Sequence, residues 1–159
     1  MSARVGIVMG SSSDKPTMDH AASTLKELGV ESETKVLSAH RTPEALREWV
    51  GGLEARGIKV VIAGAGGAAH LAGAVAAHTT LPVIGVPLAS ANAVGGGLDA
   101  LLSTAQMPRG VPVATVAVGE AGAANAGILA AQMLAIEDAE LAGRLRTMRE
   151  GMAAKVLAR

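Results

Sequence analysis

Val60-Val61-Ile62-Ala63 is a run of four apolar residues that leads into the glycine-rich segment Gly64–His70. Successive side chains of a strand point to opposite faces, so a strand that is apolar throughout buries both faces, as a central strand of a parallel sheet does. Four further segments have strand character, at residues 4–9, 31–37, 83–86 and 113–118. The sequence therefore predicts a sheet of five strands.

Helical patterns stand between these strands. The first helix is expected to begin near Asp14 and end at Gly29, and the second to begin at Thr42-Pro43. Further helices are expected after His70, at 121–136 and at 137–157. This alternation predicts an α/β fold, a three-layer sandwich with a parallel, flavodoxin-like (Rossmann-like) sheet, in one domain over residues 1–159.

Charge and composition argue against several classes of function. Lys and Arg total 14 and so do Asp and Glu, which leaves no basic surplus for binding nucleic acid. The absence of cysteine excludes disulfides, thiolate metal sites and cysteine nucleophiles. Residues 60–77 are too rich in Ala and Gly for a membrane span, and the segment after Met1 has no secretion-signal pattern. We expect a soluble, cytoplasmic protein with neither nucleic acid nor membrane as a partner.

The apolar content indicates an assembly of subunits. Half of the residues are hydrophobic, yet the chain has one Trp and no Phe or Tyr, so its core must consist of aliphatic side chains and Met. In so short a chain, this indicates that some apolar surface is buried between subunits. One stripe at helical spacing is interpreted as core or subunit contact: Leu141, Leu145, Met148, Met152 and Val156.

Polar residues that could bind a ligand follow the first two strands, at the edge of the sheet where such folds bind ligands. Gly10-Ser11-Ser12-Ser13-Asp14 offers hydroxyls and free amides at a helix start, which suits a phosphate, although a simple helix cap is the more frequent reason for such a segment. Ser38-Ala39-His40-Arg41-Thr42-Pro43 combines a proton-exchanging imidazole with an anion-binding guanidinium. An exposed polar loop is the alternative for the second segment.

The third strand leads, at the same ligand-binding edge of the sheet, into Gly64-Ala65-Gly66-Gly67-Ala68-Ala69-His70-Leu71. The lack of bulky side chains would let a flat ligand approach the backbone, and His70 is either part of a site or a buried structural histidine. The GxGxxG dinucleotide fingerprint is missing after the first strand. His20 and His78 fall in helical or helix-end positions and are expected at the surface.

Taken together, in this order and at these separations, the three loops resemble the N5-carboxyaminoimidazole ribonucleotide mutase family. The similarity covers essentially the whole chain, with further matching stretches at 81–87, 106–110 and 121–126. The resemblance implies an isomerase of purine (IMP) biosynthesis that moves a carboxylate from nitrogen to carbon of an aminoimidazole ribonucleotide. It also implies a homo-octamer with sites between subunits and with the C-terminal helix packing on neighbours, and no metal or organic cofactor.

The resemblance also assigns roles to residues. It implies that His40 is the catalytic acid and base. It implies that the phosphate and ribose end of the substrate is held by Ser11, Ser13, Asp14 and Arg41. It implies that the rest of the site is lined by Ser38, Gly66, Gly67, Ala68, His70 and Leu71.

The sequence departs from the family pattern at two places. Ala72-Gly73-Ala74 stands where the family usually has Pro-Gly-Met, and Ser90–Asp99 looks longer and richer in glycine, which concerns the shape of one loop near the site. Two other functions remain as alternatives. The related aminoimidazole ribonucleotide carboxylase, which uses free CO2, typically has Lys where Arg41 stands and lacks the Gly-Gly-Ala-Ala-His loop. A non-enzymatic nucleotide-binding regulator would not need the His40-Arg41 pair.

Overall fold

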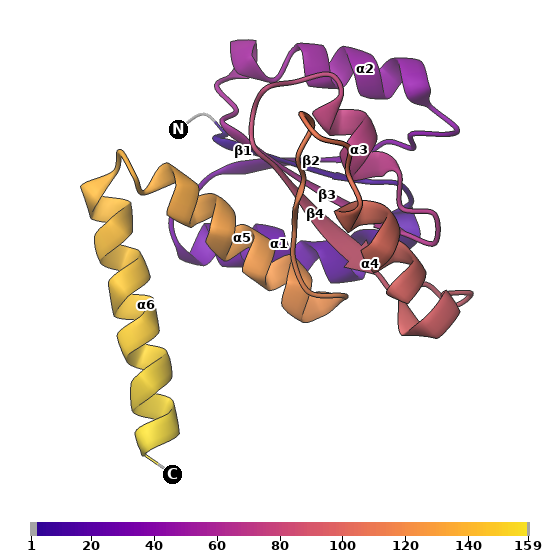
Figure 1. Ribbon diagram of the computed structural model, residues 1–159. Helices are drawn as coiled ribbons and strands as arrows, with labels where there is room; N and C mark the ends of the chain where they lie inside the picture. Colours follow the sequence, from indigo (N-terminus) through magenta and orange to yellow (C-terminus); the bar gives the residue numbers. More distant parts are fainter. Residues whose placement is uncertain (1–2, 159) are drawn as a thin grey trace.

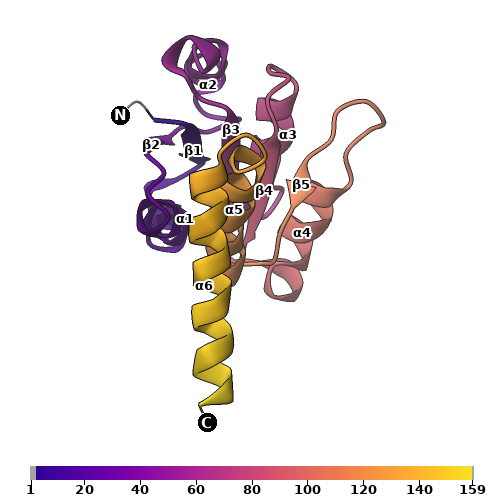
Figure 2. The same cartoon turned by 90° about the vertical axis from the view of Figure 1, so that its left-hand side faces the viewer.

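The sheet has five parallel strands in the order β2-β1-β3-β4-β5 (Figure 1, and in end view Figure 2). This computed structural model describes residues 3–158, so Met1 and Ser2, the first residues of the segment in which no secretion signal was expected, lie outside it. The strands are β1 (Val5–Met9), β2 (Ser32–Val36), β3 (Val60–Gly66), β4 (Val83–Leu88) and β5 (Ala114–Thr115). This is the flavodoxin-like strand order. The predicted α/β fold with a parallel sheet is confirmed.

Helices cover both faces of this sheet (Figures 1 and 2). They are α1 (Lys15–Glu27), α2 (Pro43–Gly51), α3 (Leu71–Ala76), α4 (Leu98–Ala105), α5 (Glu120–Leu134) and α6 (Ala139–Leu157). Buried residues of α1 and α5 form one core with the sheet, and those of α2 and α3 form a second core on the opposite face. Helix α4 lies on the second face, because its Thr104 packs directly over Gly85 of β4, beside Ala72 of α3.

Small residues let α1 and α5 approach closely. Helix α5 buries glycine and alanine almost exclusively, and a Cβ atom at Gly127 would come 2.8 Å from the carbonyl oxygen of Ala21 in α1. Only glycine allows this contact without displacing the α1 backbone. The core on this face lacks aromatic side chains, and the close approach of the α1 and α5 backbones fills the space instead.

Three segments differ from the sequence-based prediction. The expected strand at 113–118 pairs with β4 only over Ala114–Thr115, because β5 is an edge strand and the next hydrogen bonds run from Val116 N–H to Gly85 and from Gly119 N–H to Pro87. Strand β3 continues to Gly66, into the predicted glycine loop, because residues 64–66 pair with β4. Helix α4 was not predicted at all.

The apolar stripe of α6 divides into a buried and an exposed part. Leu141 is buried, and Leu145 and Met148 pack partly against the same core. By contrast, Met152 is 56% exposed and Val156 is 73% exposed, on the end of α6 that projects away from the sheet (Figure 2). Within residues 3–158, no helix is long and apolar enough to cross a membrane.

Asp138 fixes the start of α6 and joins it to the sheet. Its carboxylate accepts hydrogen bonds from the Leu141 N–H at 3.0 Å and from the Arg4 guanidinium at 2.9 Å. The hydrogen bond from the Leu141 N–H, and to a smaller extent the one from Arg4, hold the pKa of the Asp138 carboxyl below its usual value. The direction in which α6 leaves the subunit is therefore set by a capped and ion-paired residue.

Candidate active site

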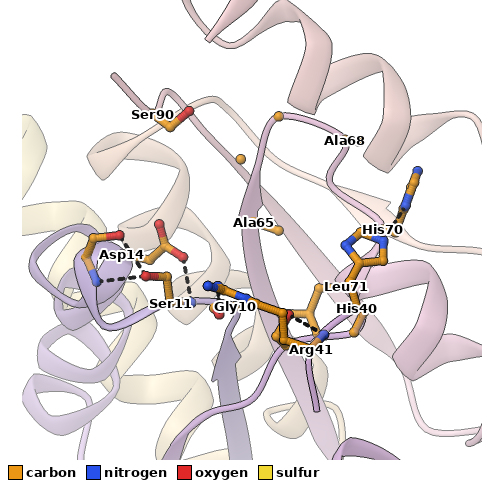
Figure 3. Close-up of a pocket in the computed structure, with 15 residues that line it drawn as sticks. Gly10, Ser11, Asp14, His40, Arg41, Ala65, Ala68, His70, Leu71 and Ser90 are labelled. Atoms are coloured by element: carbon orange, nitrogen blue, oxygen red, sulfur yellow. Dashed lines mark hydrogen bonds between the residues drawn. The ribbon is translucent and has the colours of Figure 1, made fainter. Parts of the chain in front are cut away.

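A cleft of about 420 Å³ opens at the carboxyl ends of β1, β3 and β4 (Figure 3). Strand β1 lies between β2 and β3, so the strand order reverses there, and open α/β sheets bind ligands at this point. The cleft is lined by Gly10, Ser11, Ser13, Asp14, Ser38, Ala39, His40, Arg41, Ala65, Gly66, Gly67, Ala68, His70, Leu71 and Ser90.

The loop after β1 presents hydroxyls and amides at a helix start. Ser11 caps the 3-10 turn Ser12–Asp14: its Oγ accepts from the Ser13 N–H at 3.3 Å, and its own N–H donates to the Asp14 carboxylate at 3.1 Å. The Ser11 and Ser13 hydroxyls lie 2.9 Å apart. The predicted capped helix start is thus present, and its hydroxyl groups face the cleft, so the two sequence-based interpretations of this loop are compatible.

Asp14 is half-buried beside Arg41. Burial raises the pKa of the Asp14 carboxyl above its usual value, although the Ser11 N–H and the positive charge of Arg41 act in the opposite direction. A hydrogen bond from a hydroxyl group stabilises a partly dehydrated carboxylate more than it stabilises a fully hydrated carboxylate. Asp14 is therefore suited to accept hydrogen bonds from a polyhydroxyl group in the cleft.

The loop after β2 is a tight turn that directs Arg41 toward the first loop. The Ser38 N–H donates to Thr42 Oγ1 at 2.8 Å, and the Arg41 N–H donates to Ser38 Oγ at 3.1 Å. The Arg41 guanidinium reaches back to donate to the Gly10 carbonyl oxygen at 3.2 Å, as Figure 3 shows. One of its donors is used there, which leaves others of the five for an anion beside Ser11.

The loop after β3 is built for close approach of other groups. A Cβ atom at Gly66 would come 3.1 Å from the Leu88 carbonyl oxygen and 3.3 Å from Ser90 Cβ, and Gly67 has φ +62°. Glycine is favoured at both positions for these reasons. The wall of the cleft formed by Ala65–Ala68 consequently exposes mainly backbone and methyl groups.

Two imidazoles stand at the end of the cleft away from Ser11 and Asp14 (Figure 3). His40 Nε2 lies 2.8 Å from His70 Nδ1, and the rings meet edge to face with centroids 5.0 Å apart. A hydrogen bond between two imidazole nitrogens requires one of them to be protonated and the other not. The pair can therefore hold and pass on a proton.

All eleven site residues predicted from the sequence line this one cleft. Sequence reasoning missed Gly10, Ala39, Ala65 and Ser90. Ser90 follows β4, and the same strand-end rule that selected the first three loops could have selected it. His20 and His78 are exposed and lie outside the cleft, as expected. Among residues 3–158, no three His, Asp or Glu side chains are grouped so that they could hold a metal ion.

The arrangement combines three chemical capacities. Hydroxyls, a helix start and a guanidinium can bind an anionic group at one end. A pair of imidazoles can exchange a proton at the other end. Between them, a wall without large side chains leaves room for a flat ring.

The protein resembles known enzymes along its whole length. Its N5-carboxyaminoimidazole ribonucleotide mutase relatives include that of Bacillus subtilis strain 168, 58% identical over 153 residues, which are 96% of this chain and 93% of the relative. The Escherichia coli K12 mutase is 53% identical over 155 residues, which are 98% of this chain and 90% of the relative. The crystal structure of Treponema denticola PurE has a TM-score of 0.87 at 32% identity, covering 97% of this chain and 94% of that one. The family model described as AIR carboxylase matches residues 4–155, and the chain therefore belongs to the AIR carboxylase family.

Proposed function

We propose that this protein converts N5-carboxyaminoimidazole ribonucleotide to 4-carboxy-5-aminoimidazole ribonucleotide in purine biosynthesis, and is thus an isomerase. The observation that carries the proposal is the single cleft in which the Ser11–Asp14 loop, Arg41 and the His40–His70 pair meet. The mutase name of relatives more than 50% identical over almost the whole chain supports the same reaction.

The substrate is oriented by its two ends. The phosphate lies against the Ser11 and Ser13 hydroxyls and Arg41, and the Asp14 carboxylate accepts from a ribose hydroxyl. The aminoimidazole then reaches toward His40, along the wall formed by Gly66, Gly67 and Ala68. This orientation is supported by the geometry of the cleft, because the anion-binding groups and the imidazoles stand at opposite ends.

His40 moves one proton twice in the proposed reaction. The carbamate nitrogen loses CO2 and receives a proton from His40, which leaves aminoimidazole ribonucleotide with an uncharged ring. C4 of the ring then attacks the CO2 carbon, and His40, now neutral, removes the C4 hydrogen to restore the aromatic ring. Protons and charge balance over the two steps, so no further reactant is required. Such acid–base catalysis contributes about 10²–10⁴ in rate.

The proposal includes an assembly that closes the cleft. His40, Arg41 and His70 are all exposed in the single subunit, whereas a reaction that must retain CO2 requires a site from which water is excluded. We propose that neighbouring subunits of a cytoplasmic homo-octamer complete the cover. The exposed apolar end of α6 supports contact between subunits, since Met152 and Val156 have no neighbour in the described part of this chain that buries them.

Two substrates distinguish this proposal from the alternatives. Purified protein is incubated with N5-carboxyaminoimidazole ribonucleotide without bicarbonate, and with aminoimidazole ribonucleotide plus bicarbonate. A mutase forms the carboxylated product rapidly from the first substrate. A carboxylase requires the second mixture, and a non-enzymatic regulator turns over neither. Arg41 and the Gly66–His70 loop favour the mutase, because the related carboxylases typically have Lys in place of Arg41 and lack this loop.

A further inference from the structure

Ser103 of α4 lies against the loop that carries His70. Its Oγ accepts a hydrogen bond from the Ala69 N–H at 3.0 Å, and it also lies 3.3 Å from the carbonyl oxygen of Gly67. Ser103 is not among the residues that line the cleft. It is therefore placed to act on the site through the loop rather than by contact with a ligand.

The hydroxyl proton of Ser103 is used within α4. Ser103 Oγ lies 2.8 Å from the carbonyl oxygen of Asp99, one turn earlier, which is shorter than its distances to Gly67 and Ala100. A hydroxyl has one proton and two lone pairs, so donation to Asp99 leaves the lone pairs for the Ala69 N–H. The hydrogen bond to Asp99 thus orients the Ser103 hydroxyl so that it can accept from the Ala69 N–H.

The anchored loop is sharp and leads directly to His70. Gly67 has φ +62°, and the His70 N–H returns to the Ala68 carbonyl oxygen at 2.8 Å. Ala69 between them is only 1% exposed, so its N–H cannot turn to bulk water if Ser103 is lost. His70 also occupies the N-cap position of α3, where its side chain makes no capping hydrogen bond. A shift of Ala69 would therefore move the imidazole that touches His40.

We propose that Ser103 is a positioning residue, which holds the turn at residues 67–70 so that His70 stays in hydrogen-bond contact with His40. The inference rests on the proposed function, in which His40 carries the proton. Displacement of a reacting group by about 1 Å can lower a rate about a hundredfold. Ser103 consequently affects the chemical step more than substrate binding, because the phosphate-binding groups lie on other loops.

The test compares three variants in turnover of N5-carboxyaminoimidazole ribonucleotide. Ser103→Ala is expected to lower kcat about tenfold or more, with KM changed less than about threefold. Ser103→Thr keeps the hydroxyl and is expected to retain at least half of the wild-type kcat. Thr104→Ser is the matched control on the same helix, because it trims the methyl group packed over Gly85 and leaves the loop untouched; it should lower the melting temperature without lowering kcat.

Three kinetic results overturn the proposal. The first is a kcat for Ser103→Ala within twofold of wild type. The second is an equal fall of kcat in Thr104→Ser, which would show that general weakening of α4 is the cause. The third is a fall in Ser103→Thr as large as in Ser103→Ala.

The imidazole signals separate this proposal from the proposed function. With ¹³C-labelled histidine, Ser103→Ala should shift the ring resonances of His40 and His70 and leave those of His20 and His78 unchanged. Unchanged resonances of His40 and His70 contradict the positioning role. Wild-type protein that does not turn over the ribonucleotide contradicts the proposed function alone, and the ring resonances still decide whether Ser103 holds His70.

Discussion

His40 Nε2 and His70 Nδ1 lie 2.8 Å apart, although the two residues are 30 positions apart in the chain. They follow β2 and β3, which lie on either side of β1. The fold thus brings the two imidazoles together beyond the carboxyl end of β1, where the strand order reverses. Only one hydrogen fits between the two nitrogens, so each ring constrains the protonation state of the other.

Replacement of His40 should abolish most of the turnover and spare binding. His40→Asn removes the group that exchanges the proton, so kcat is expected to fall by about 10²–10⁴. The dissociation constant of the ribonucleotide should change little, because the phosphate is held by other residues. Steady-state kinetics and a binding titration measure the two effects. Turnover retained within tenfold would remove His40 from the mechanism.

Arg41→Ala should mainly weaken binding of the phosphate. The loss of a charge-assisted hydrogen bond amounts to roughly 1.5–3 kcal/mol, or about 10- to 150-fold in Kd. The dephosphorylated ribonucleoside serves as the matched ligand. It should bind wild-type protein weakly and lose little further affinity in the variant. An equal loss for both ligands would show that Arg41 acts elsewhere.

The pH dependence of stability should reveal the burial of Asp14. Because its pKa is raised in the folded protein, its contribution to stability is present at low pH and is lost as the pH rises through the folded pKa. Asp14→Asn stays neutral and can still accept from the Ser11 N–H. The melting temperature of Asp14→Asn relative to wild type is therefore expected to rise between pH 4 and pH 7. A relative fall over this range would contradict the assignment.

The exposed end of α6 should be required for assembly. Met152→Asp places a charge on the apolar stripe at a residue that is 56% exposed in the single subunit. A charge at Met148 would also destabilise the single subunit, because Met148 packs partly against the subunit's own core. Ala154→Asp adds the same charge on the opposite side of α6. Sedimentation at micromolar concentration should show an oligomer for wild type and Ala154→Asp, and dissociation with reduced activity for Met152→Asp.

An active wild-type monomer near 15.8 kDa would contradict the proposed assembly. A Met152→Asp variant that sediments like wild type would place the contact elsewhere on the surface.

The sequence predicted those parts of the structure that have a strong local pattern. The apolar runs of β1, β3 and β4 indicated buried strands, and the strand-end rule placed the loops of Ser11, His40 and His70 at one edge of the sheet. The motif resemblance then assigned roles to eleven residues, all of which line the cleft. Local pattern and topology were therefore sufficient for the centre of the site.

The parts that were missed depend on contacts between distant residues. Helix α4 is only eight residues long, follows three glycines with positive φ, and begins without a side-chain cap, so the usual signals of a helix start are missing. Ser103 consequently had no visible role, since its partners are Gly67 and Ala69, more than 30 positions earlier. Strand β5 was predicted too long, because the apolar residues 116 and 118 leave the regular pairing with β4.

The origin of the transferred carboxylate tests the central claim most directly. Purified protein is supplied with unlabelled N5-carboxyaminoimidazole ribonucleotide in buffer containing ¹³C-bicarbonate, and the carboxylate of the product is analysed by mass spectrometry. A mutase that retains CO2 in its cleft gives product with almost no ¹³C during the first turnovers. Product that carries ¹³C in proportion to the dissolved CO2 would contradict transfer within the site and show that the protein carboxylates the ring with free CO2.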